Sequence, residues 1–461
     1  AYVCVVGACV NWLQSIEKCT GRVCRAALQQ TRRREDQRAR TDARHITRLL
    51  LPIVFWFGIT SVISSLLAEN WPGWRGPQRG GVSTDKNIPT QWSATEGIAW
   101  KKELPGSGIA SPIIWDDKIL VTAADGQKND ELHLICLDRK DGKKLWHLRL
   151  WGTSPTRYHS TKGSMASPTP VTDGDRVYAF FSTGDVFAVD LDGHLCWHRS
   201  LATEYGSFEN RFSATSSPLL YRDLVVIQCD HFGDSYVVAV DKTTGVDRWR
   251  VERPDTWVSW SSPQLARVND SGAYELVLCS SEKIDGLDPE TGRQLWTLRG
   301  MQRECIPTPV LGHQLILAVS GPRGTTFAFR PGGRGDITES HVVWQTNRGA
   351  PYVPSGILVG DYYYLTTDQG IANCFAAQTG KRVWQKRLPG SYTASPIAAD
   401  GKIFFTNDQG ETVVVQADVP EYQELAHNPL NEPVVASSAI ASGHIYMRTL
   451  RHLLAIDGST K

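Results

Sequence analysis

A short unit recurs along this chain and constrains its fold more than any other feature of the sequence. In its clearest copy, an apolar run from Val237 ends at Asp241, Gly245 follows four residues later, and Trp249 comes four residues after that. The apolar run predicts a buried strand. Asp and then Gly predict a tight turn, because Asp can cap the backbone N–H groups of the turn and Gly adopts positive φ without steric cost. The unit is therefore a strand, an Asp–Gly turn and a second strand that carries a tryptophan.

The unit repeats with a period that is typical of a β-propeller. Successive copies place the tryptophan at steps of 40 to 52 residues, at Trp100, Trp146, Trp197, Trp249, Trp296, Trp344 and Trp384, and a degenerate copy has Leu425 there. A period of about 40–50 residues with several strands in each repeat indicates propeller blades. Trp100 has no Asp–Gly turn before it, and the last turn, at Asp457, has no tryptophan strand after it. We therefore expect the N-terminal Trp100 strand to complete the C-terminal blade and close the ring, which leaves no free sheet edge.

A second marker, a small residue followed by Ser-Pro, lies between the units. It occurs at Ser111, Ser167, Ser217, Ser262 and Ser395, with variants at Ile306-Pro307, Val353-Pro354 and Ser437-Ser438. Eight markers match the eight tryptophan positions once Leu425 is counted. The sequence therefore predicts an all-β fold, an eight-bladed propeller of four-stranded antiparallel blades, over residues 98–461.

Three segments precede the blades. Residues 1–48 carry ten Lys/Arg against four Asp/Glu, and we expect either a basic, disordered leader or residues foreign to the natural product. Residues 49–68 are almost continuously apolar behind a basic flank, which predicts an export signal cleaved after Ala68. An uncleaved membrane anchor is the alternative, since about 20 residues can span a bilayer. Residues 69–97 are Gly- and Pro-rich, so we expect a lead-in without regular structure that packs on the propeller rim.

Charge and missing motifs limit the function. The net charge is +1, and residues 1–48 contribute +6 (10 − 4), which leaves −5 (1 − 6) for the remainder. A mildly acidic body argues against a nucleic-acid partner. The sequence has no Gly-x-Ser-x-Gly elbow, phosphate loop or His-Glu-x-x-His motif. The spacings of Cys4, Cys9, Cys19 and Cys24 match no zinc pattern. We predict no catalytic residue and no metal site.

Propeller ligands usually bind at the axis, where the innermost strands converge and the blade-to-blade loops open on one face. The loops before the markers hold arginines and aromatic residues that we predict to line a polar, aromatic funnel: Arg157, His159, Arg211, Trp260, Arg303, Arg348, Tyr352 and Tyr392. Such a funnel suits a planar anion or a peptide segment, because Arg pairs with carboxylates through two hydrogen bonds. The alternative is that these side chains are ordinary residues of a channel mouth, satisfied by water and by their neighbours.

The pattern Ala-x-Asp-x-x-Thr-Gly-x-x-x-Trp, seen at Ala239–Trp249, resembles the tryptophan-docking repeat of PQQ-like (quinoprotein-type) propellers. The segment Trp-Pro-Gly-Trp-Arg-Gly-Pro from Trp71 is similar to the start of exported, planctomycete-type PQQ-like repeat proteins. The resemblance covers residues 70–461. It implies that the repeat tryptophans dock between neighbouring blades. Fold alone does not settle function, because one fold serves many tasks.

Two branches of this family imply different functions. Quinoprotein dehydrogenases hold PQQ and Ca²⁺ at the axis, and the alcohol enzymes often have a disulfide between adjacent cysteines. This chain has no Cys-Cys pair and lacks the large insertions of those enzymes. The other branch, the propeller subunit of the outer-membrane β-barrel assembly machine, is non-catalytic and presents loops to a partner protein.

We therefore expect an exported, monomeric, non-catalytic propeller without a cofactor. It would act as a protein-binding or scaffolding module in the cell envelope, periplasmic or extracellular, with another envelope protein as its partner. The alternatives are a PQQ-dependent oxidoreductase, with PQQ and Ca²⁺ as cofactors, and a small-anion or sugar binder at the propeller axis.

Overall fold

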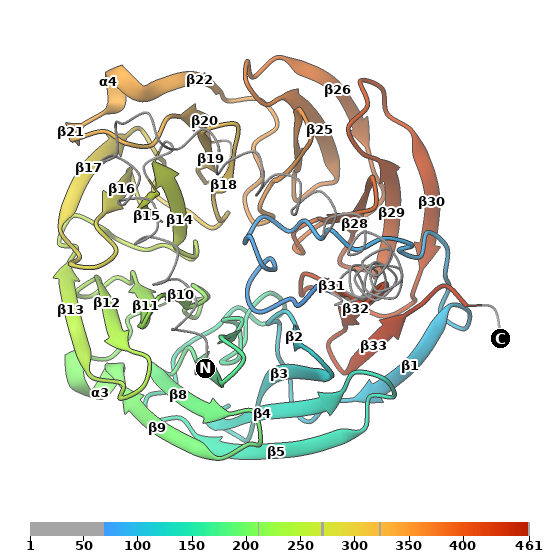
Figure 1. The fold of residues 1–461 in the computed structure, drawn as a ribbon, viewed down its shortest axis with the longest axis horizontal. Helices are drawn as coiled ribbons and strands as arrows, with labels where there is room; N and C mark the ends of the chain where they lie inside the picture. The colour runs from blue at the N-terminus through green and yellow to red at the C-terminus, as the bar shows by residue number, and fades with distance from the viewer. Residues whose placement is uncertain (1–68, 211, 269–271, 322–323, 460–461) are drawn as a thin grey trace, which may run out of the picture. The chain divides into compact units, whose positions relative to one another are not determined.

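The computed structural model describes residues 69–461 except for 211, 269–271, 322–323 and 460–461. These residues form eight β-sheets around a central axis (Figure 1). Each sheet has four antiparallel strands, and one sheet has a short fifth strand. The predicted all-β, eight-bladed fold is confirmed. The predictions for residues 1–48 and 49–68 lie outside the described residues. Within the described ranges, no helix is long and apolar enough to cross a membrane.

The blades follow one another along the chain and are numbered here in that order. Blades 1 and 2 comprise β2 (Ile113–Trp115), β3 (Lys118–Asp125), β4 (Glu131–Asp138) and β5 (Lys144–Trp151), then β6 (Val171–Thr172), β7 (Arg176–Phe180), β8 (Asp185–Asp190) and β9 (Leu195–Ser200). Blades 3 and 4 comprise β10 (Leu219–Tyr221), β11 (Leu224–Cys229), β12 (Tyr236–Asp241) and β13 (Asp247–Glu252), then β14 (Gln264–Val268), β15 (Ala273–Cys279), β16 (Lys283–Leu287) and β17 (Gln294–Arg299).

The second half of the ring has the same plan. Blades 5 and 6 comprise β18 (Val310–Gly312), β19 (Leu315–Val319), β20 (Thr326–Phe329) and β22 (Val342–Thr346), then β23 (Ile357–Val359), β24 (Tyr362–Thr366), β25 (Ile371–Ala376) and β26 (Arg382–Arg387). Blade 7 comprises β27 (Ile397–Ala399), β28 (Lys402–Thr406), β29 (Glu411–Gln416) and β30 (Glu424–Pro429). Two short helices, α3 (Leu201–Tyr205) and α4 (Thr338–His341), lie between strands.

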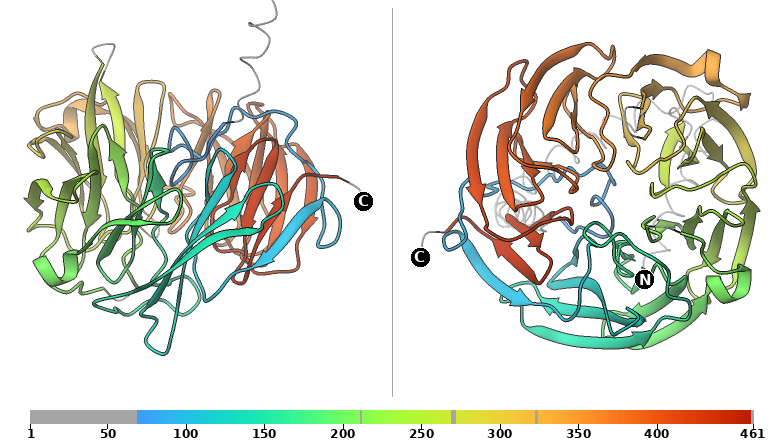
Figure 2. Two further views of the ribbon diagram at one scale, coloured as in Figure 1. Left: turned by 60° about the horizontal axis from the view of Figure 1, so that its bottom comes forward. Right: turned by 180° about the vertical axis from the view of Figure 1, so that it is seen from behind.

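Blade 8 joins the two ends of the propeller, as predicted. Its three inner strands are β31 (Ala439–Ala441), β32 (His444–Arg448) and β33 (His452–Ile456), and its outer strand is β1 (Ile98–Glu103). Trp100 pairs with Ala455, and Glu103 pairs with His452. The two segments lie side by side in every view (Figures 1 and 2). Ring closure pairs the outer edge of the last blade, so the C-terminal sheet has no missing strand.

The ring has two unlike faces. Blades 1 to 7 each begin with the innermost strand and end with the outermost strand, and blade 8 begins with its innermost strand, β31. Consequently, the loops that join blades and the turns between second and third strands lie on one face, which we call the loop face. The turns between first and second strands and between third and fourth strands lie on the other, which we call the turn face.

The tryptophan of one blade docks on the glycine-containing turn between the third and fourth strands of the next, and four of the five turns below also have the Asp of the repeat unit. Five indole Nε1 groups donate to backbone carbonyls of that turn at 2.8–3.2 Å: Trp100 to Arg139, Trp146 to Leu191, Trp197 to Lys242, Trp249 to Pro289 and Trp344 to Ala377. Each of these rings also covers the glycine of the turn, where a Cβ atom would come within 2.5–2.9 Å of the ring. The glycines are Gly142, Gly193, Gly245, Gly292 and Gly380, and all have positive φ. The glycine thus serves both the turn and the docking of the ring.

Trp296 and Trp384 make different contacts, for reasons that their neighbours explain. In blade 5 a longer Gly-rich segment replaces the Asp–Gly turn, and Trp296 instead donates to the Glu275 carboxylate of its own blade at 2.8 Å. Its ring covers Gly286, where a Cβ would clash at 2.0 Å. The longer segment adds β21 (Gly335–Asp336), which pairs in parallel with β17. Blade 7 has lost the turn glycine, and there Trp384 packs edge-on against Tyr422.

The lead-in, residues 69–97, corrects one expectation, because it crosses the axis as well as touching the rim (Figure 1). Trp71 is buried and pairs with Ile114 of β2 through two backbone hydrogen bonds of 2.8 and 2.9 Å. Asn70 accepts from Asp116, and Asp85 accepts from Gly443. Both partners are in turns between first and second strands, so the lead-in lies on the turn face. It has no regular helix or sheet strand before β1, as expected.

The docking geometry predicts that Gly380→Ala destabilises the propeller more than Gly335→Ala. The two glycines have almost the same φ, +68° and +67°, but a Cβ meets the Trp344 ring at 2.5 Å at Gly380 and nothing within 4 Å at Gly335. We expect Gly335→Ala to cost about 1 kcal/mol from backbone strain alone. Gly380→Ala should cost a further 1–3 kcal/mol, roughly, from overpacking. Free energies of unfolding from denaturant titration measure both. Equal losses would show that tryptophan docking contributes nothing.

Candidate functional site

Eight hydroxyl residues surround the propeller axis, one from each blade. Each stands two residues before the start of an innermost strand: Ser111, Thr169, Ser217, Ser262, Thr308, Ser355, Ser395 and Ser437. In three blades the sequence marker was therefore placed two residues too early. The markers assigned to Ser167, Ile306 and Val353 belong to Thr169, Thr308 and Ser355. Thr-Pro replaces Ser-Pro in the first two, and Ser-Gly replaces it in the third.

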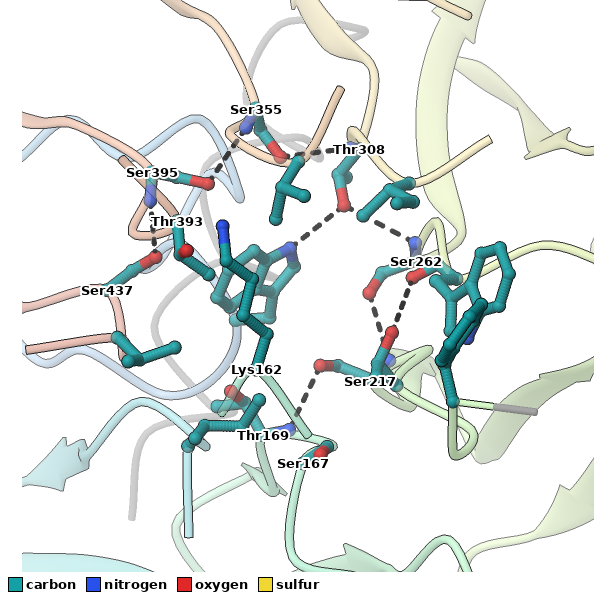
Figure 3. A pocket seen from close by; sticks show the side chains of 18 of the residues that line it. Lys162, Ser167, Thr169, Ser217, Ser262, Thr308, Ser355, Thr393, Ser395 and Ser437 are labelled. Atoms are coloured by element: carbon teal, nitrogen blue, oxygen red, sulfur yellow. Dashed lines mark hydrogen bonds between the residues drawn. The ribbon is translucent and has the colours of Figure 1, made fainter. Parts of the chain in front are cut away.

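These residues surround the axis in a hydrogen-bonded series, which we call the hydroxyl ring, and Figure 3 labels all of them except Ser111. From Ser111 to Ser395, the backbone N–H of each member donates to the hydroxyl of the next blade, in seven bonds of 2.9–3.3 Å. Seven blade junctions are thereby tied at the axis. The Oγ of Ser111 makes no hydrogen bond to the described residues. The eighth junction, between blades 8 and 1, is joined differently. There the buried Arg448 of blade 8 donates to the Ala110 carbonyl of blade 1 at 3.2 Å.

A second layer lies two residues earlier in each blade. Its members alternate in sequence with the ring, and all line one axial cavity of about 420 Å³: Ile109, Ser167, Thr215, Trp260, Ile306, Val353, Thr393 and Val435. Four are aliphatic and one is a tryptophan, so this layer is mostly apolar. The three hydroxyl members come from blades 2, 3 and 7. The cavity therefore has polar groups at the hydroxyl ring and mainly apolar walls above it.

Trp74 of the lead-in closes the cavity at the turn face. Its Nε1 donates to the Thr308 hydroxyl of the ring at 3.0 Å (Figure 3). The neighbouring Arg75 is buried and donates to the Gly80 and Gly356 carbonyls at 2.7 and 2.6 Å. Burial without a carboxylate lowers the pKa of Arg75 to about 10. Arg75 thus fixes the lead-in against blade 6. Trp74 is therefore held by its own hydrogen bond to Thr308 and by the contacts of its neighbour Arg75.

The opposite end of the cavity opens on the loop face. Phe212, His159 and Trp260 form an aromatic series there, with ring centroids 5.8 Å apart for His159–Phe212 and 6.0 Å apart for Phe212–Trp260. Lys162 extends over the cavity, with its Nζ 3.7 Å from Asp408. Across the opening, Asp368 accepts the backbone N–H of Tyr352 at 2.8 Å. The mouth thus combines aromatic faces with one cation and one carboxylate.

The predicted funnel residues divide between the cavity and its surroundings. His159, Trp260 and Tyr352 line the cavity. Arg157, Arg303 and Arg348 are exposed and do not line it. Arg303 lies over the Trp257 ring, 4.1 Å from its centroid. Tyr392 is buried in the hydrophobic core, and Arg211 lies outside the described residues.

The two tyrosines among these residues differ in their environment. The Tyr352 hydroxyl donates to the Glu304 carboxylate, and burial together with that carboxylate raises its pKa. Burial also raises the pKa of Tyr392, whose hydroxyl has no hydrogen-bond partner among the described residues. Both side chains are therefore neutral phenols at physiological pH, and neither is poised to act as a base.

The main site residues that the sequence reasoning missed are the hydroxyl ring, Trp74 and Asp368. The ring carried a signal, because a hydroxyl residue recurs two positions before each innermost strand. For Trp74 the sequence offered only the general expectation that a tryptophan side chain is buried. Asp368 sits in the turn between β24 and β25, and no sequence pattern distinguishes it from other turn aspartates.

The donor set of the cavity does not fit a quinone cofactor with Ca²⁺. Ca²⁺ takes six to eight oxygen ligands, several of them usually carboxylates. Among the described residues of the lining, Asp368 is the one carboxylate residue, and one of its oxygens already accepts a backbone N–H. PQQ carries three carboxylates, but Lys162 is the one Lys or Arg that the structure describes in the lining. Within the described residues, no three or more His, Cys, Asp or Glu side chains are grouped to hold a metal ion.

The loop face presents five large aromatic side chains, one of which, Phe212, also lines the cavity mouth. Trp151 and Trp257 are 64% and 54% exposed, and Tyr158, Phe212 and Phe232 are also exposed. All five lie at strand ends, blade-to-blade loops or second-to-third-strand turns of blades 1 to 3. The exposed large hydrophobic residues of the turn-face ends of strands are mainly aliphatic: Leu145, Leu195, Val246 and Leu425, with Tyr274. Aromatic exposure is thus concentrated on one face and one side of the ring.

Comparison with known proteins identifies relatives of two kinds. A family model described as outer membrane protein assembly factor BamB matches residues 81–227 and 207–386. The protein of that name from Burkholderia pseudomallei (strain K96243) is 23% identical over 332 residues, covering 71% of this chain and 66% of that protein. This chain therefore spans slightly less than two thirds of that relative. The resemblance to PQQ-like propellers is confirmed.

The solved structures with similar folds include both branches. BamB from Moraxella catarrhalis superposes with a TM-score of 0.56 and 14% identity, covering 77% of this chain and 95% of that chain. The quinohemoprotein alcohol dehydrogenases ADHIIG from Pseudomonas putida HK5 and from Comamonas testosteroni each give a TM-score of 0.63 with 13% identity, covering 85% of this chain and 81% of theirs. At such identities the likeness shows the fold alone.

The hydroxyl ring predicts unequal costs for two alanine substitutions within it. Ser217→Ala removes the acceptor of the Thr169 N–H and leaves that buried group without a partner. We expect a loss of about 1–3 kcal/mol in the free energy of unfolding. Ser111→Ala removes a hydroxyl that accepts no hydrogen bond, so it should cost less than about 0.5 kcal/mol. Denaturant titration distinguishes them, and similar values for the two variants would contradict a structural role for the ring.

Proposed function

This chain belongs to the family of PQQ-like repeat propellers described as outer membrane protein assembly factor BamB, and we propose that it is a non-catalytic protein-binding or scaffolding module of the cell envelope. Its partner is another envelope protein, and its place is periplasmic or extracellular. The family description, which names an assembly factor, supports the class of partner. The aromatic residues of the loop face support the mode of binding.

The exposed aromatic group on the loop face carries this proposal. Trp, Tyr and Phe are enriched in protein interfaces, where a few of them supply most of the binding energy. Isolated exposed apolar residues are ordinary on a protein surface, but a concentration on one face marks an interaction site. Blades 1 to 3 supply five aromatic side chains to this face.

Trp257 has the features of a binding anchor. Its side chain is 54% exposed, yet its ring is covered on one side by the Arg303 guanidinium at 4.1 Å from the centroid. Such a cation–π contact is worth about 0.5–1 kcal/mol at an exposed site. The backbone beside it is fixed, because Val258 donates to Ser281 at 3.2 Å and Ser281 donates back to Val258 and to Arg303. A ring held in place loses little conformational entropy when a partner covers it.

The polar side chains that the structure describes at the cavity mouth are engaged by their neighbours. The carboxylate Glu304 accepts from the Tyr352 hydroxyl, Asp368 accepts a backbone N–H, and Lys162 is paired with Asp408. The Thr161 hydroxyl lies 3.2 Å from His159 Nδ1, but that nitrogen already accepts the backbone N–H groups of Thr161 and Lys162. Binding is therefore the function that these groups support best.

Site-specific photo-crosslinking tests which face binds a partner. We expect a photoreactive amino acid at Trp151 or Trp257 to crosslink one envelope protein in living cells. The same probe at Leu195 or Val246, which are exposed near the turn face, should not crosslink it. Mass spectrometry identifies the crosslinked protein. Equal crosslinking from both faces, or crosslinking from the turn-face positions only, would contradict the proposal.

A titration with PQQ and Ca²⁺ tests the oxidoreductase alternative. Because the described lining of the cavity has one carboxylate residue and one lysine, we expect no saturable quenching of tryptophan fluorescence and no dye-linked alcohol oxidation at PQQ concentrations up to about millimolar. Trp74 and Trp260 line the cavity, so a bound quinone would alter the emission directly. Saturable quenching together with turnover would make the chain a quinoprotein enzyme and overturn the non-catalytic reading.

A further inference from the structure

We infer that the axial cavity, which shares Phe212 with the loop-face surface, is a second binding site, for a small neutral saccharide. Its size fits a ligand of that kind. Small-molecule sites generally have volumes of about 300–1,000 Å³, and the cavity measures about 420 Å³. It is closed by Trp74 at one end and open on the loop face at the other, so a ligand has a single direction of entry.

The hydroxyl ring supplies unused hydrogen-bond donors to this cavity. A hydroxyl has one O–H donor and two acceptor lone pairs. Seven ring hydroxyls accept a backbone N–H, and within the described part of the chain their own protons find no acceptor. A ligand that carries many oxygens near the ring would satisfy these protons.

Thr393 provides an independent indication of a ligand. Its side chain lines the cavity and is only 8% exposed, and its Oγ1 has no hydrogen-bond partner among the described residues. A buried hydroxyl without a partner costs free energy, so such groups in native structures call for an explanation. A ligand hydroxyl in the cavity would be that partner.

The apolar walls of the cavity match the C–H faces of a sugar ring. Saccharides present C–H faces as well as hydroxyl groups, and the Trp260 and Phe212 rings stand 6.0 Å apart at the mouth with an interplanar angle of 45°. Aromatic faces receive C–H surfaces while hydroxyl and carboxylate groups fix orientation. Asp368, on the opposite side of the mouth, can accept hydrogen bonds from sugar hydroxyls.

Charge favours a neutral ligand over an anion. Among the described residues, the one lining cation, Lys162, is already paired with Asp408 at 3.7 Å, and the lining includes the Asp368 carboxylate. The arginines that the sequence suggested for anion binding, Arg157, Arg303 and Arg348, do not line the cavity. An entirely apolar ligand would leave the ring hydroxyls and Thr393 without partners, which is costly.

The test is calorimetric and fluorescence titration of the full-length chain with glucose, N-acetylglucosamine and their β-linked disaccharides. We expect saturable binding of at least one of these probes with a Kd on the order of millimolar or tighter, accompanied by a change in tryptophan emission. Citrate and phosphate should not compete. Absence of saturable binding by all four sugars, or binding of the anions in their place, would overturn the inference.

Two pairs of variants locate the site. Thr393→Val keeps the shape and removes the unpartnered hydroxyl, so sugar affinity should fall about 2- to 10-fold without loss of stability. Thr366→Val is the matched control, because Thr366 also has a buried hydroxyl without a partner but lies outside the cavity. Phe212→Ala should weaken sugar binding, and Phe232→Ala, also exposed on the loop face, should not. If either control weakened binding as much as its partner, the site would not be the axial cavity. Photo-crosslinking tests the protein partner in a separate experiment. Absence of sugar binding would therefore leave the proposed function unaffected.

Discussion

The contact between a tryptophan ring and the glycine of the next blade is the interaction on which the rest of this propeller depends. A blade alone would expose both of its faces, and the ring persists because each blade is fixed to its neighbour. At five junctions the indole covers a turn glycine and donates a hydrogen bond to the same turn. The tryptophan acts on the outside of the ring and the hydroxyl ring acts at the axis, so both ends of these junctions are fixed. The cavity and the loops hold their shape because the blades beneath them cannot rotate.

The repeat unit predicts most of this architecture, because each part of it has a local physical role. An Asp–Gly turn, a tryptophan four residues on and a period of 40 to 52 residues require blades, and the unmatched half-units at the two ends require closure through β1. The contacts of Trp296 could not be predicted in the same way. They depend on Gly286, which admits the ring into its own blade, and on a distant carboxylate, Glu275. Tertiary contacts of this kind leave no periodic signal in the sequence.

The candidate site was harder to predict than the fold. Arginines and aromatic residues in axial loops suggested a polar, aromatic funnel, but a side chain in such a loop need not line the cavity, and Arg303 lies over the Trp257 ring instead. Direction in a loop depends on backbone geometry that the sequence does not reveal. The hydroxyl residues, in contrast, precede strands of fixed direction, and their side chains meet at the axis. In this fold, residues next to innermost strands are therefore better guides to an axial site than charged residues in the loops.

Closure through β1 also has a kinetic consequence. Trp100 pairs with Ala455, a separation of 355 residues (455 − 100), whereas most strand pairs join neighbours in the chain. Contacts at such a separation form slowly, because the entropy of closing a long loop is lost before the pairing contributes any favourable free energy. As the chain is made, seven blades can assemble in order while β1, whose one neighbour in the sheet is β33, remains unpaired. Pairing with β33 thus completes the ring, and until β33 is made the edges of the Trp100 strand are open to other chains.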